Sequence, residues 1–342
     1  MAFTTQKHLI VYVKTTETCN LNCAHCFTSG INGRKIYFDA DKTAKWCNEL
    51  DDGSNRIHFE YHGGEPLLAP MKDLWHFYNV TKDHWGDKCT HGITTNLTYK
   101  LTDERIEFLK ILDSGSIGTS WDPNIRFANE KQRKLWEDNV KLLVAEGCYI
   151  QCFISVSKDV VAMDPLEIAD YMYSLGIGTI SYERLTHDGN ATINTEIFPH
   201  NSELDAFWMK MHETTKDHPI ENNFLNSVYD KFSKGQFFNG TFCRDCEQKI
   251  HTINADGTVA GCPNTAPTQW YGDISMPAKE VRLSPKRMEI ISCETHDRDP
   301  RCYDCPVFIY CHSDCHQLQW MEDVCPAPKT LMLKLAGDKG WI

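Results

Sequence analysis

The chain has 342 residues, of which 41% are hydrophobic and 24% charged, and its formal net charge is −12. The composition is ordinary for a soluble globular protein, and the length suffices for more than one domain. No apolar run approaches a transmembrane span, and the polar N-terminus lacks a signal-peptide core, so we expect a cytoplasmic protein without a membrane partner. The acidic balance, without a basic stripe, argues against a nucleic-acid partner.

Short apolar runs alternate with amphipathic stretches over the first half of the chain. The apolar runs predict six strands, at residues 9–13, 57–61, 92–96, 116–121, 149–155 and 179–182. Helical spacing predicts helices between them, near residues 39–50, 70–84, 102–112, 129–146 and 165–175. Repeated strand–helix alternation favours an α/β fold with a parallel sheet, open or closed, in which active sites lie at the carboxyl ends of the strands.

The rest of the chain changes in character twice. After an α/β domain expected over residues 1–185, residues 186–240 read as a helical connector, with helices near 201–211 and 221–234. Residues 241–330 are rich in cysteine and poor in periodic patterns, and a short C-terminal tail is expected over residues 331–342.

Sixteen cysteines are many for a cytoplasmic chain. A reducing compartment disfavours disulfides, so clustered thiols there are more often metal ligands or catalytic groups. Eleven of them fall into motifs. The other five are interpreted as ordinary buried or half-buried residues: Cys47, Cys89, Cys148, Cys152 and Cys293.

The first cysteine motif directly follows the first predicted strand. Cys19, Cys23 and Cys26 have the spacing C-x3-C-x2-C, and the aromatic Phe27 comes next. Three thiolates can hold three irons of a cubane iron–sulfur cluster, which leaves the fourth iron open to a small ligand. A zinc site is the alternative, although zinc usually takes four ligands in paired C-x2-C units.

A second motif, Gly63-Gly64-Glu65-Pro66, ends the second predicted strand. Two glycines let the backbone approach a ligand closely, and the carboxylate beside them can accept a hydrogen bond from a ligand ammonium group. A motif of this kind is weak alone, because glycine pairs are common in turns.

The two motifs together resemble those of the radical S-adenosylmethionine (AdoMet) superfamily. The resemblance implies a partial (β/α)6 barrel and a [4Fe–4S] cluster whose open iron binds AdoMet. It also implies that Gly63, Gly64 and Glu65 bind the methionyl end of AdoMet and that Phe27 packs near the adenine. In this superfamily the reduced cluster cleaves AdoMet, and the resulting 5′-deoxyadenosyl radical removes a hydrogen atom from the substrate.

Polar residues at other strand ends are candidates for further contacts with the cofactor. Asn96, Ser120 and Ser155 lie at the ends of the third, fourth and fifth predicted strands. Arg126 or Arg133 has the chemistry to pair with the AdoMet carboxylate in a bidentate manner. Each of these residues has an alternative role as a helix cap or loop residue.

Four residues are candidate catalytic acids or bases: His62, Asp122, Glu183 and His251. Histidine titrates near neutral pH, which suits proton transfer. A single histidine is nevertheless more often a hydrogen-bonded structural residue, and nothing in the sequence places any of the four against a substrate.

The cysteine-rich segment carries a second, longer pattern. Cys246 is separated by ten residues from Gly257, and Cys262 follows after four more. The pattern continues with Cys302, Cys305, Cys311, Cys315 and, after a gap, Cys325, while Cys243 precedes it. Two structural zinc sites are the alternative interpretation.

Combined with the N-terminal motif, this pattern resembles the SPASM domain of radical AdoMet maturases, which in its full form carries two auxiliary [4Fe–4S] clusters. By this resemblance, the ligands of the first cluster are Cys243, Cys246, Cys262 and Cys315. Those of the second are Cys302, Cys305, Cys311 and Cys325. Four thiolates for each cluster leave no open iron, which favours electron transfer over binding of substrate.

The leading functional hypothesis is therefore a radical AdoMet oxidoreductase that modifies a peptide by crosslinking, thioether formation or dehydrogenation. Its expected partners are the peptide and an electron donor such as flavodoxin or ferredoxin. Two features depart from known relatives. Pro263 follows Cys262 where sulfatase maturases have an aspartate. The first strand starts too early for an N-terminal leader-recognition domain, so either a separate protein delivers the peptide or the substrate is not a leader-bearing peptide. The alternatives are modification of a small molecule or nucleoside, and a non-enzymatic zinc-stapled binding module.

Overall fold

The computed structural model describes residues 8–28, 30–235, 242, 244–264 and 267–342. Six parallel strands form the N-terminal domain: β1 (His8–Thr16), β2 (Arg56–Gly63), β3 (Cys89–Ile93), β4 (Ser116–Ser120), β5 (Tyr149–Val156) and β6 (Thr179–Arg184). Strands β1 to β3 pair in order in one sheet, and β4 to β6 pair in order in a second. A bridge between Thr94 and Gly118 joins β3 to β4. The strands form the partial (β/α)6 barrel expected from the sequence.

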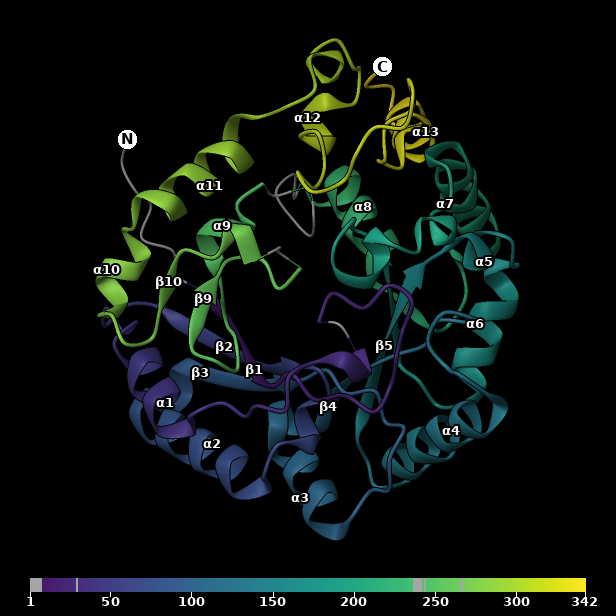
Figure 1. Ribbon diagram of the computed structural model, residues 1–342. Helices are drawn as coiled ribbons and strands as arrows, with labels where there is room; N and C mark the ends of the chain where they lie inside the picture. Colours follow the sequence, from purple (N-terminus) through teal and green to yellow (C-terminus); the bar gives the residue numbers. More distant parts are fainter. Residues whose placement is uncertain (1–7, 29, 236–241, 243, 265–266) are drawn as a thin grey trace.

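Helices cover the outside of these strands (Figure 1). They are α1 (Ala40–Asn48), α2 (Met71–Trp85), α3 (Asp103–Ile111), α4 (Glu130–Ala145), the short α5 (Lys158–Val161) and α6 (Pro165–Ser174). Most begin at a residue whose side chain accepts a backbone N–H of the first turn, as Asp39 does for α1 and Asn129 for α4. The main hydrophobic core lies between strands and helices, because alternate strand residues such as Val11 and Phe59 face outward and are fully buried.

The connector contributes to the barrel as well as linking the two halves of the chain. It contains α7 (Asn201–Thr215), β7 (Glu221–Asn222) and α8 (Asn223–Ser233). The two-residue strand β7 pairs in parallel with β6 and extends that side of the sheet. The two predicted helices of this region are therefore present.

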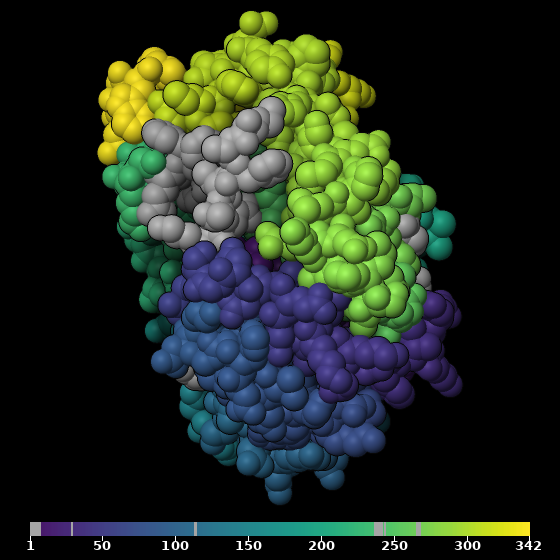
Figure 2. All heavy atoms as spheres, turned by 90° about the vertical axis from the view of Figure 1, so that its left-hand side faces the viewer, coloured from purple at the N-terminus to yellow at the C-terminus, as the bar shows by residue number. Residues whose placement is uncertain are grey.

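The cysteine-rich segment is joined to the barrel by a shared sheet. It contains α9 (Cys246–Lys249), β8 (Ile250–Ile253), β9 (Thr258–Ala260), β10 (Gly272–Asp273), α10 (Ala278–Arg282), α11 (Pro285–His296) and α12 (Phe308–Cys311). Strand β8 pairs in parallel with β1 on the edge opposite β2, and β9 and β10 follow in antiparallel order. Figure 2 shows this segment, in green, lying against the purple and blue N-terminal residues.

Two local predictions differ from the structure. The third strand was expected over residues 92–96 but spans Cys89–Ile93, because the following residues Thr95 and Asn96 turn away to bond the loop after β2. The expected C-terminal tail is mostly a helix, α13 (Lys329–Asp338), which buries Leu331 and Met332 against the rest of the fold. Among the described residues, no helix has both the length and the hydropathy needed to cross a membrane.

Candidate cofactor and metal sites

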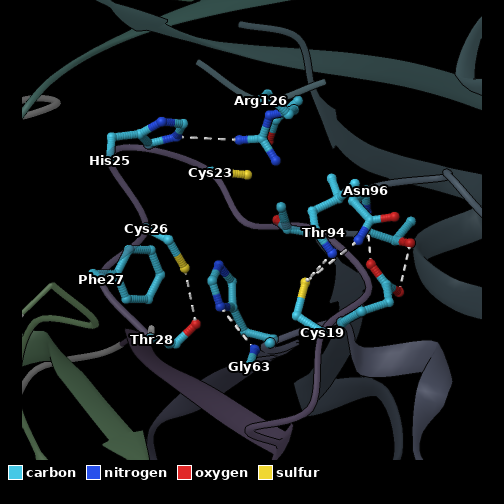
Figure 3. Close-up of a pocket in the computed structure, with 16 residues that line it drawn as sticks. Cys19, Cys23, His25, Cys26, Phe27, Thr28, Gly63, Thr94, Asn96 and Arg126 are labelled. Carbon is cyan, nitrogen blue, oxygen red and sulfur yellow. Dashed lines mark hydrogen bonds between the residues drawn. The ribbon is translucent and has the colours of Figure 1, made fainter. Parts of the chain in front are cut away.

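A pocket lies where the loop after β1 meets the carboxyl ends of β2, β3 and β4. Figure 3 shows the sulfur atoms of Cys19, Cys23 and Cys26 facing one common space in it. Its lining also includes Leu21, His25, Phe27, Thr28, His62, Gly63, Gly64, Glu65, Thr94, Thr95, Asn96, Ser120 and Arg126. The structure therefore brings both N-terminal motifs and two of the polar strand-end candidates, Asn96 and Ser120, to one place.

The cysteine loop presents donors to its own sulfur atoms. The backbone N–H of Leu21 donates to Cys19 Sγ at 3.4 Å, and that of Gly30 donates to Cys26 Sγ at 3.2 Å. Burial raises the pKa of Cys19 to about 12 and that of Cys23 to about 11, so these groups become thiolates only beside a compensating positive charge. Sulfur atoms with N–H donors around one space fit the ligation of an iron–sulfur cluster.

The two glycines of the second motif are required by the chain itself. A Cβ atom on Gly63 would lie 2.3 Å from the carbonyl oxygen of Thr16, and one on Gly64 would lie 2.3 Å from that of Thr18. The N–H groups of Gly64 and Glu65 donate to these same two carbonyls, each at 2.8 Å. The loop after β2 thus lies directly on the segment that leads to Cys19, and it holds that segment in place.

The Glu65 carboxylate has a structural role that the sequence did not indicate. It is fully buried and accepts hydrogen bonds from the N–H of Asn96 at 2.8 Å, from the hydroxyl of Thr95 at 2.8 Å and from the N–H of Leu67 at 3.1 Å. Asn96 in turn donates through Nδ2 to Asn20 at 2.9 Å. Glu65 therefore joins the end of β3 to the loop after β2, beside the cysteine loop.

Phe27 is enclosed by two side chains from the barrel interior. His62 stacks on it with ring centroids 5.4 Å apart, and the ammonium group of Lys14 lies 5.2 Å from its centroid. Burial lowers the pKa of His62 to about 3, and its Nδ1 accepts the N–H of Gly63 at 2.9 Å. His62 is thus neutral at physiological pH, with one nitrogen already engaged.

Asp122 forms a buried ionic group at the pocket edge. It is fully buried, accepts the N–H of Ser155, and is bonded to the guanidinium of Arg126, which lies 3.4 Å from His25. Although burial acts against the charge, Arg126 and His25 keep the pKa of Asp122 below its usual value. An ionised carboxylate in this ion pair positions Arg126 and the cysteine loop, and it is a weak proton acceptor.

Four other candidates, Arg133, His251, Glu183 and Ser155, are not among the residues that line the pocket. Arg133 is held on α4 by Glu130 and Glu137, and Arg126 takes the position at the pocket. His251 is fully buried against Trp46 on the outer face of the sheet, away from the barrel interior, so a catalytic role does not fit its place. Glu183 and Ser155 are paired at the ends of β6 and β5. They lie on the face opposite the outward-packed Ile154 and Tyr182, so both face the barrel interior, where desolvation raises the pKa of Glu183.

Three residues after β6, Gly189, Asn190 and Asn194, hold the cysteine loop in place and are called the clamp below. They were not identified from the sequence. Asn190 donates through its N–H to the carbonyl of Cys26 at 2.8 Å and through Nδ2 to that of Cys23 at 3.0 Å. Asn194 donates through Nδ2 to the carbonyl of Ala24 at 2.9 Å. Gly189 lies so close that a Cβ there would be 2.2 Å from the Cys26 carbonyl oxygen. The connector after β6 therefore fixes the loop from its other side.

Two of the four ligands expected for the first auxiliary cluster bond a pair of buried glutamates, and the residue after a third ligand lies beside the same pair. Glu294 accepts the N–H groups of Cys246 and Glu247, each at 2.9 Å, and Glu247 accepts that of Cys262 at 3.3 Å. His316, directly after Cys315, lies 3.8 Å from Glu247 and 3.7 Å from Glu294. The fourth expected ligand, Cys243, lies outside the described residues.

The four cysteines expected for the second auxiliary cluster line a second pocket. Cys302 ends a short 3-10 helix (Pro300–Cys302), Cys305 lies in the loop after it, Cys311 ends α12 and Cys325 lies in the loop before α13. Trp320 and Phe308 complete much of the wall. A set of four thiols around one hollow fits the ligation of a cubane cluster. Within the described residues, no three histidine, cysteine or acidic side chains converge closely enough to hold a single metal ion.

A buried ion pair ties the barrel to the loop between the two auxiliary sets. Arg184, the last residue of β6, pairs with Asp314, and its Nη2 donates to Asp314 Oδ1 at 2.8 Å. Asp314 also accepts the N–H of Cys315 at 2.8 Å. His312, Ser313 and Asp314 all have positive φ, so a tight left-handed loop presents this carboxylate to the barrel.

The fold is shared with solved structures over nearly its whole length. Native anSMEcpe with bound AdoMet and the Cp18Cys peptide superimposes at a TM-score of 0.79, with 17% identity and 97% of each chain covered. Streptococcus suis SuiB bound to the precursor peptide SuiA gives a TM-score of 0.61, with 14% identity, 93% of this chain and 76% of that chain covered. The expected partial barrel with a cysteine-rich C-terminal domain is therefore confirmed, and the resemblance stated from the motifs is confirmed at the level of the fold.

Sequence comparison is less informative. No family model matches the chain. An uncharacterized protein of Methanocaldococcus jannaschii, MJ0907, is 36% identical over 118 residues, which make up 34% of this chain. The match spans 38% of the length of that relative.

Proposed function

We propose that the chain is a radical AdoMet enzyme that oxidatively modifies a peptide, and that it acts as an oxidoreductase or maturase. The observation that carries this proposal is the shared pocket of the two N-terminal motifs, at the carboxyl ends of the strands, in a fold whose solved relatives include AdoMet-bound structures. An enzyme of an α/β barrel places its reaction at this end of the strands.

In this proposal Cys19, Cys23 and Cys26 hold a [4Fe–4S] cluster, and AdoMet binds the remaining iron. Together these groups supply the reductive cleavage that yields a hydrogen-abstracting radical. The backbone of Gly63 and Gly64 faces the methionyl end of AdoMet, and Phe27 faces the adenine.

The polar groups around the same pocket would complete the AdoMet site. Asn96 and Ser120 line the pocket and are our candidates for polar contacts with the cofactor. Arg126 is the better-placed partner for the carboxylate, because it lines the pocket while Arg133 is paired on its own helix. Glu65 and Asp122 are positioning residues.

We further propose two auxiliary [4Fe–4S] clusters with the cysteine sets given above. The pocket lined by Cys302, Cys305, Cys311 and Cys325 supports the second set. The bonds of Cys246 and Cys262 to two neighbouring glutamates, with His316 beside the same glutamates, support the first. Clusters with four protein thiolates accept electrons without binding substrate. They suit reactions in which a substrate radical is oxidised.

Iron analysis tests the cluster assignment. Three cubane clusters predict about twelve irons per chain after anaerobic reconstitution. The variant Cys305→Ser is expected to lose about four of them. Cys293→Ser is the matched control, because Cys293 is exposed on α11 and belongs to no motif, so its iron content stays that of the wild type. A colourless protein with stoichiometric zinc would instead favour a zinc-stapled binding module.

A peptide substrate is supported by the neighbours of the fold, since both anSMEcpe and SuiB have been solved with peptides. The reaction needs an electron donor, for which flavodoxin or ferredoxin is suited, and a separate leader-binding protein is a further candidate partner. The decisive experiment is anaerobic turnover of candidate peptides with AdoMet and dithionite, followed by mass spectrometry. Loss of two hydrogens from the peptide, together with 5′-deoxyadenosine, is the expected result. Turnover of only a small molecule or nucleoside would overturn the peptide assignment.

A further inference from the structure

Lys14, near the end of β1, is a buried cation that pairs with no carboxylate among the residues that the structure describes. Its side chain points to the barrel interior beside His62, and the residue is only 7% exposed. Its ammonium group donates to the carbonyl oxygen of Pro263 at 3.2 Å. The acidic groups that act on Lys14 electrostatically are Glu17 and Asp256, and both are bonded to Arg34.

The Lys14 ammonium contacts two residues, and each of them directly follows a proposed cluster ligand. Phe27, whose ring it faces at 5.2 Å, follows Cys26. Pro263 follows Cys262. This arrangement results from the pairing of β8 with β1, which brings the cysteine-rich segment alongside the strand that carries Lys14. Lys14 therefore lies between the N-terminal triad and the first auxiliary set.

An ammonium group buried in this way needs compensating negative charge, because desolvation strongly disfavours an isolated ion. Burial lowers the pKa of Lys14 to about 8, while Cys262, Glu17, Cys26 and Asp256 act in the opposite direction. Lys14 thus stays charged at neutral pH, and Cys262 and Cys26 would supply negative charge beside it when they ligate clusters as thiolates.

We propose that Lys14 is a fixed positive charge between the N-terminal cluster and the first auxiliary cluster, and that it raises the reduction potential of both, the auxiliary one more strongly. The inference rests on the proposed function. Reduction adds negative charge to a cluster, and a nearby cation stabilises that added charge. The effect is larger at the auxiliary cluster, because the ammonium donates directly to the residue after Cys262, whereas it only faces the ring of Phe27.

The test is a redox titration followed by electron paramagnetic resonance, without substrate. Lys14→Met removes the charge while keeping the length of the side chain, Lys14→Arg keeps the charge, and Lys42→Met is the matched control on the exposed face of α1. For Lys14→Met we expect the equilibrium constant for reducing the auxiliary cluster to fall by about tenfold or more, as for a charge removed at several ångströms. Lys14→Arg and Lys42→Met are expected to stay close to the wild type. The signal that shifts on addition of AdoMet identifies the N-terminal cluster.

Each outcome either supports or contradicts the proposed effect of Lys14 on the reduction potentials. Potentials in Lys14→Met equal to those of the wild type would overturn the inference. If Lys14→Met assembles no clusters, the iron contents of Lys14→Gln and Lys14→Arg are compared instead. Cluster assembly in Lys14→Arg alone supports the need for a positive charge. Failure of all three variants to assemble clusters means that the packing of Lys14, and not its charge, is required, which contradicts the inference. A wild-type chain without clusters overturns the proposed function as well, whereas normal clusters in the wild type with unchanged potentials in the variant overturn only the role of Lys14.

Discussion

The backbone N–H of Asn96 donates a hydrogen bond of 2.8 Å to the Glu65 carboxylate, and this contact joins the end of β3 to the loop after β2. Both segments line the proposed AdoMet pocket, so the contact sets the shape of the site. It is a buried, charge-assisted hydrogen bond, the type whose loss costs most.

Glu65→Gln is therefore expected to weaken AdoMet binding by about tenfold and to destabilise the fold by about 2 kcal/mol. The amide NH2 of the glutamine would face the N–H and O–H groups that donate to the Glu65 carboxylate, and it cannot accept their hydrogen bonds. Equilibrium dialysis under anaerobic conditions measures the affinity, and the urea midpoint measures the stability. Glu104→Gln, on the exposed first turn of α3, is the control and should change neither quantity appreciably. Unaltered AdoMet binding in Glu65→Gln would contradict this role.

The buried pair of Asp122 and Arg126 makes a second prediction. Asp122→Asn leaves the Arg126 guanidinium buried without its counter-charge, which costs about 3 kcal/mol. In the double variant Asp122→Asn/Arg126→Gln no unpaired charge remains, so part of that loss is recovered. Thermal unfolding of the wild type, Asp122→Asn, Arg126→Gln and the double variant yields the coupling energy.

The exposed pair of Lys134 and Asp138 on α4 is the matched control. Asp138→Asn should change stability by less than about 0.5 kcal/mol, as is usual for surface ion pairs. A strictly additive double variant would show that Asp122 and Arg126 do not act together.

A third prediction concerns the clamp on the cysteine loop. Gly189 has φ of +55°, and a Cβ there would collide with the Cys26 carbonyl oxygen. Gly189→Ala should thus cost at least about 2 kcal/mol and lower the iron retained by the N-terminal triad. Gly235 also has positive φ, at +65°, but open space surrounds it. Gly235→Ala should cost only about 1 kcal/mol and leave the iron content unchanged. Equal iron loss in the two variants would count against a clamp.

The fourth prediction is a pH dependence of stability that comes from His91. This residue is buried among aromatic rings on β3, and burial lowers the pKa of its imidazole to about 3. The unfolded chain takes up a proton near its ordinary pKa of about 6.5, while the folded chain does not. The stability from neutral His91 is complete above that value and falls by roughly 1.4 kcal/mol per unit as the pH drops below it.

His91→Gln should reduce the slope of stability against pH between pH 6.5 and pH 5.5 by up to about 1.4 kcal/mol per unit, as measured by urea unfolding relative to the wild type. Other buried histidines such as His62 retain their share of the slope. His76→Gln is the control, because His76 is half exposed on α2. A wild-type slope that persists in His91→Gln would assign the pH dependence to other groups.

The sequence indicated those parts of the site whose residues lie close together along the chain. The cysteine spacing, the glycine pair and the strand ends lie within short stretches, and the fold brings them to one pocket. The partners of these motifs come from distant segments with no pattern of their own. Asn190 and Asn194 lie about 170 residues from the loop that they bond, and Thr95 and Asn96 about 30 from Glu65. Only a three-dimensional arrangement makes such polar residues recognisable.

The same dependence on distant segments explains why some candidate residues do not lie in the pocket. Arg126 and Arg133 offer the same chemistry, and only the turn of the chain decides that one lines the pocket while the other pairs along α4. His251 lies in a four-residue strand, too short for alternation to reveal which face it occupies. The final helix was recognisable, since Leu331, Met332 and Leu335 follow a helical period, but the shortness of the segment led to the expectation of a tail.

The central claim is that Cys19, Cys23 and Cys26 hold a redox-active cluster with an open iron that binds AdoMet. Electron paramagnetic resonance of the anaerobically reconstituted and reduced protein, recorded with and without AdoMet, tests it most directly. The account predicts a cluster signal that shifts when AdoMet is added and that disappears in the Cys19→Ala/Cys23→Ala/Cys26→Ala variant. A spectrum that AdoMet leaves unchanged would contradict it.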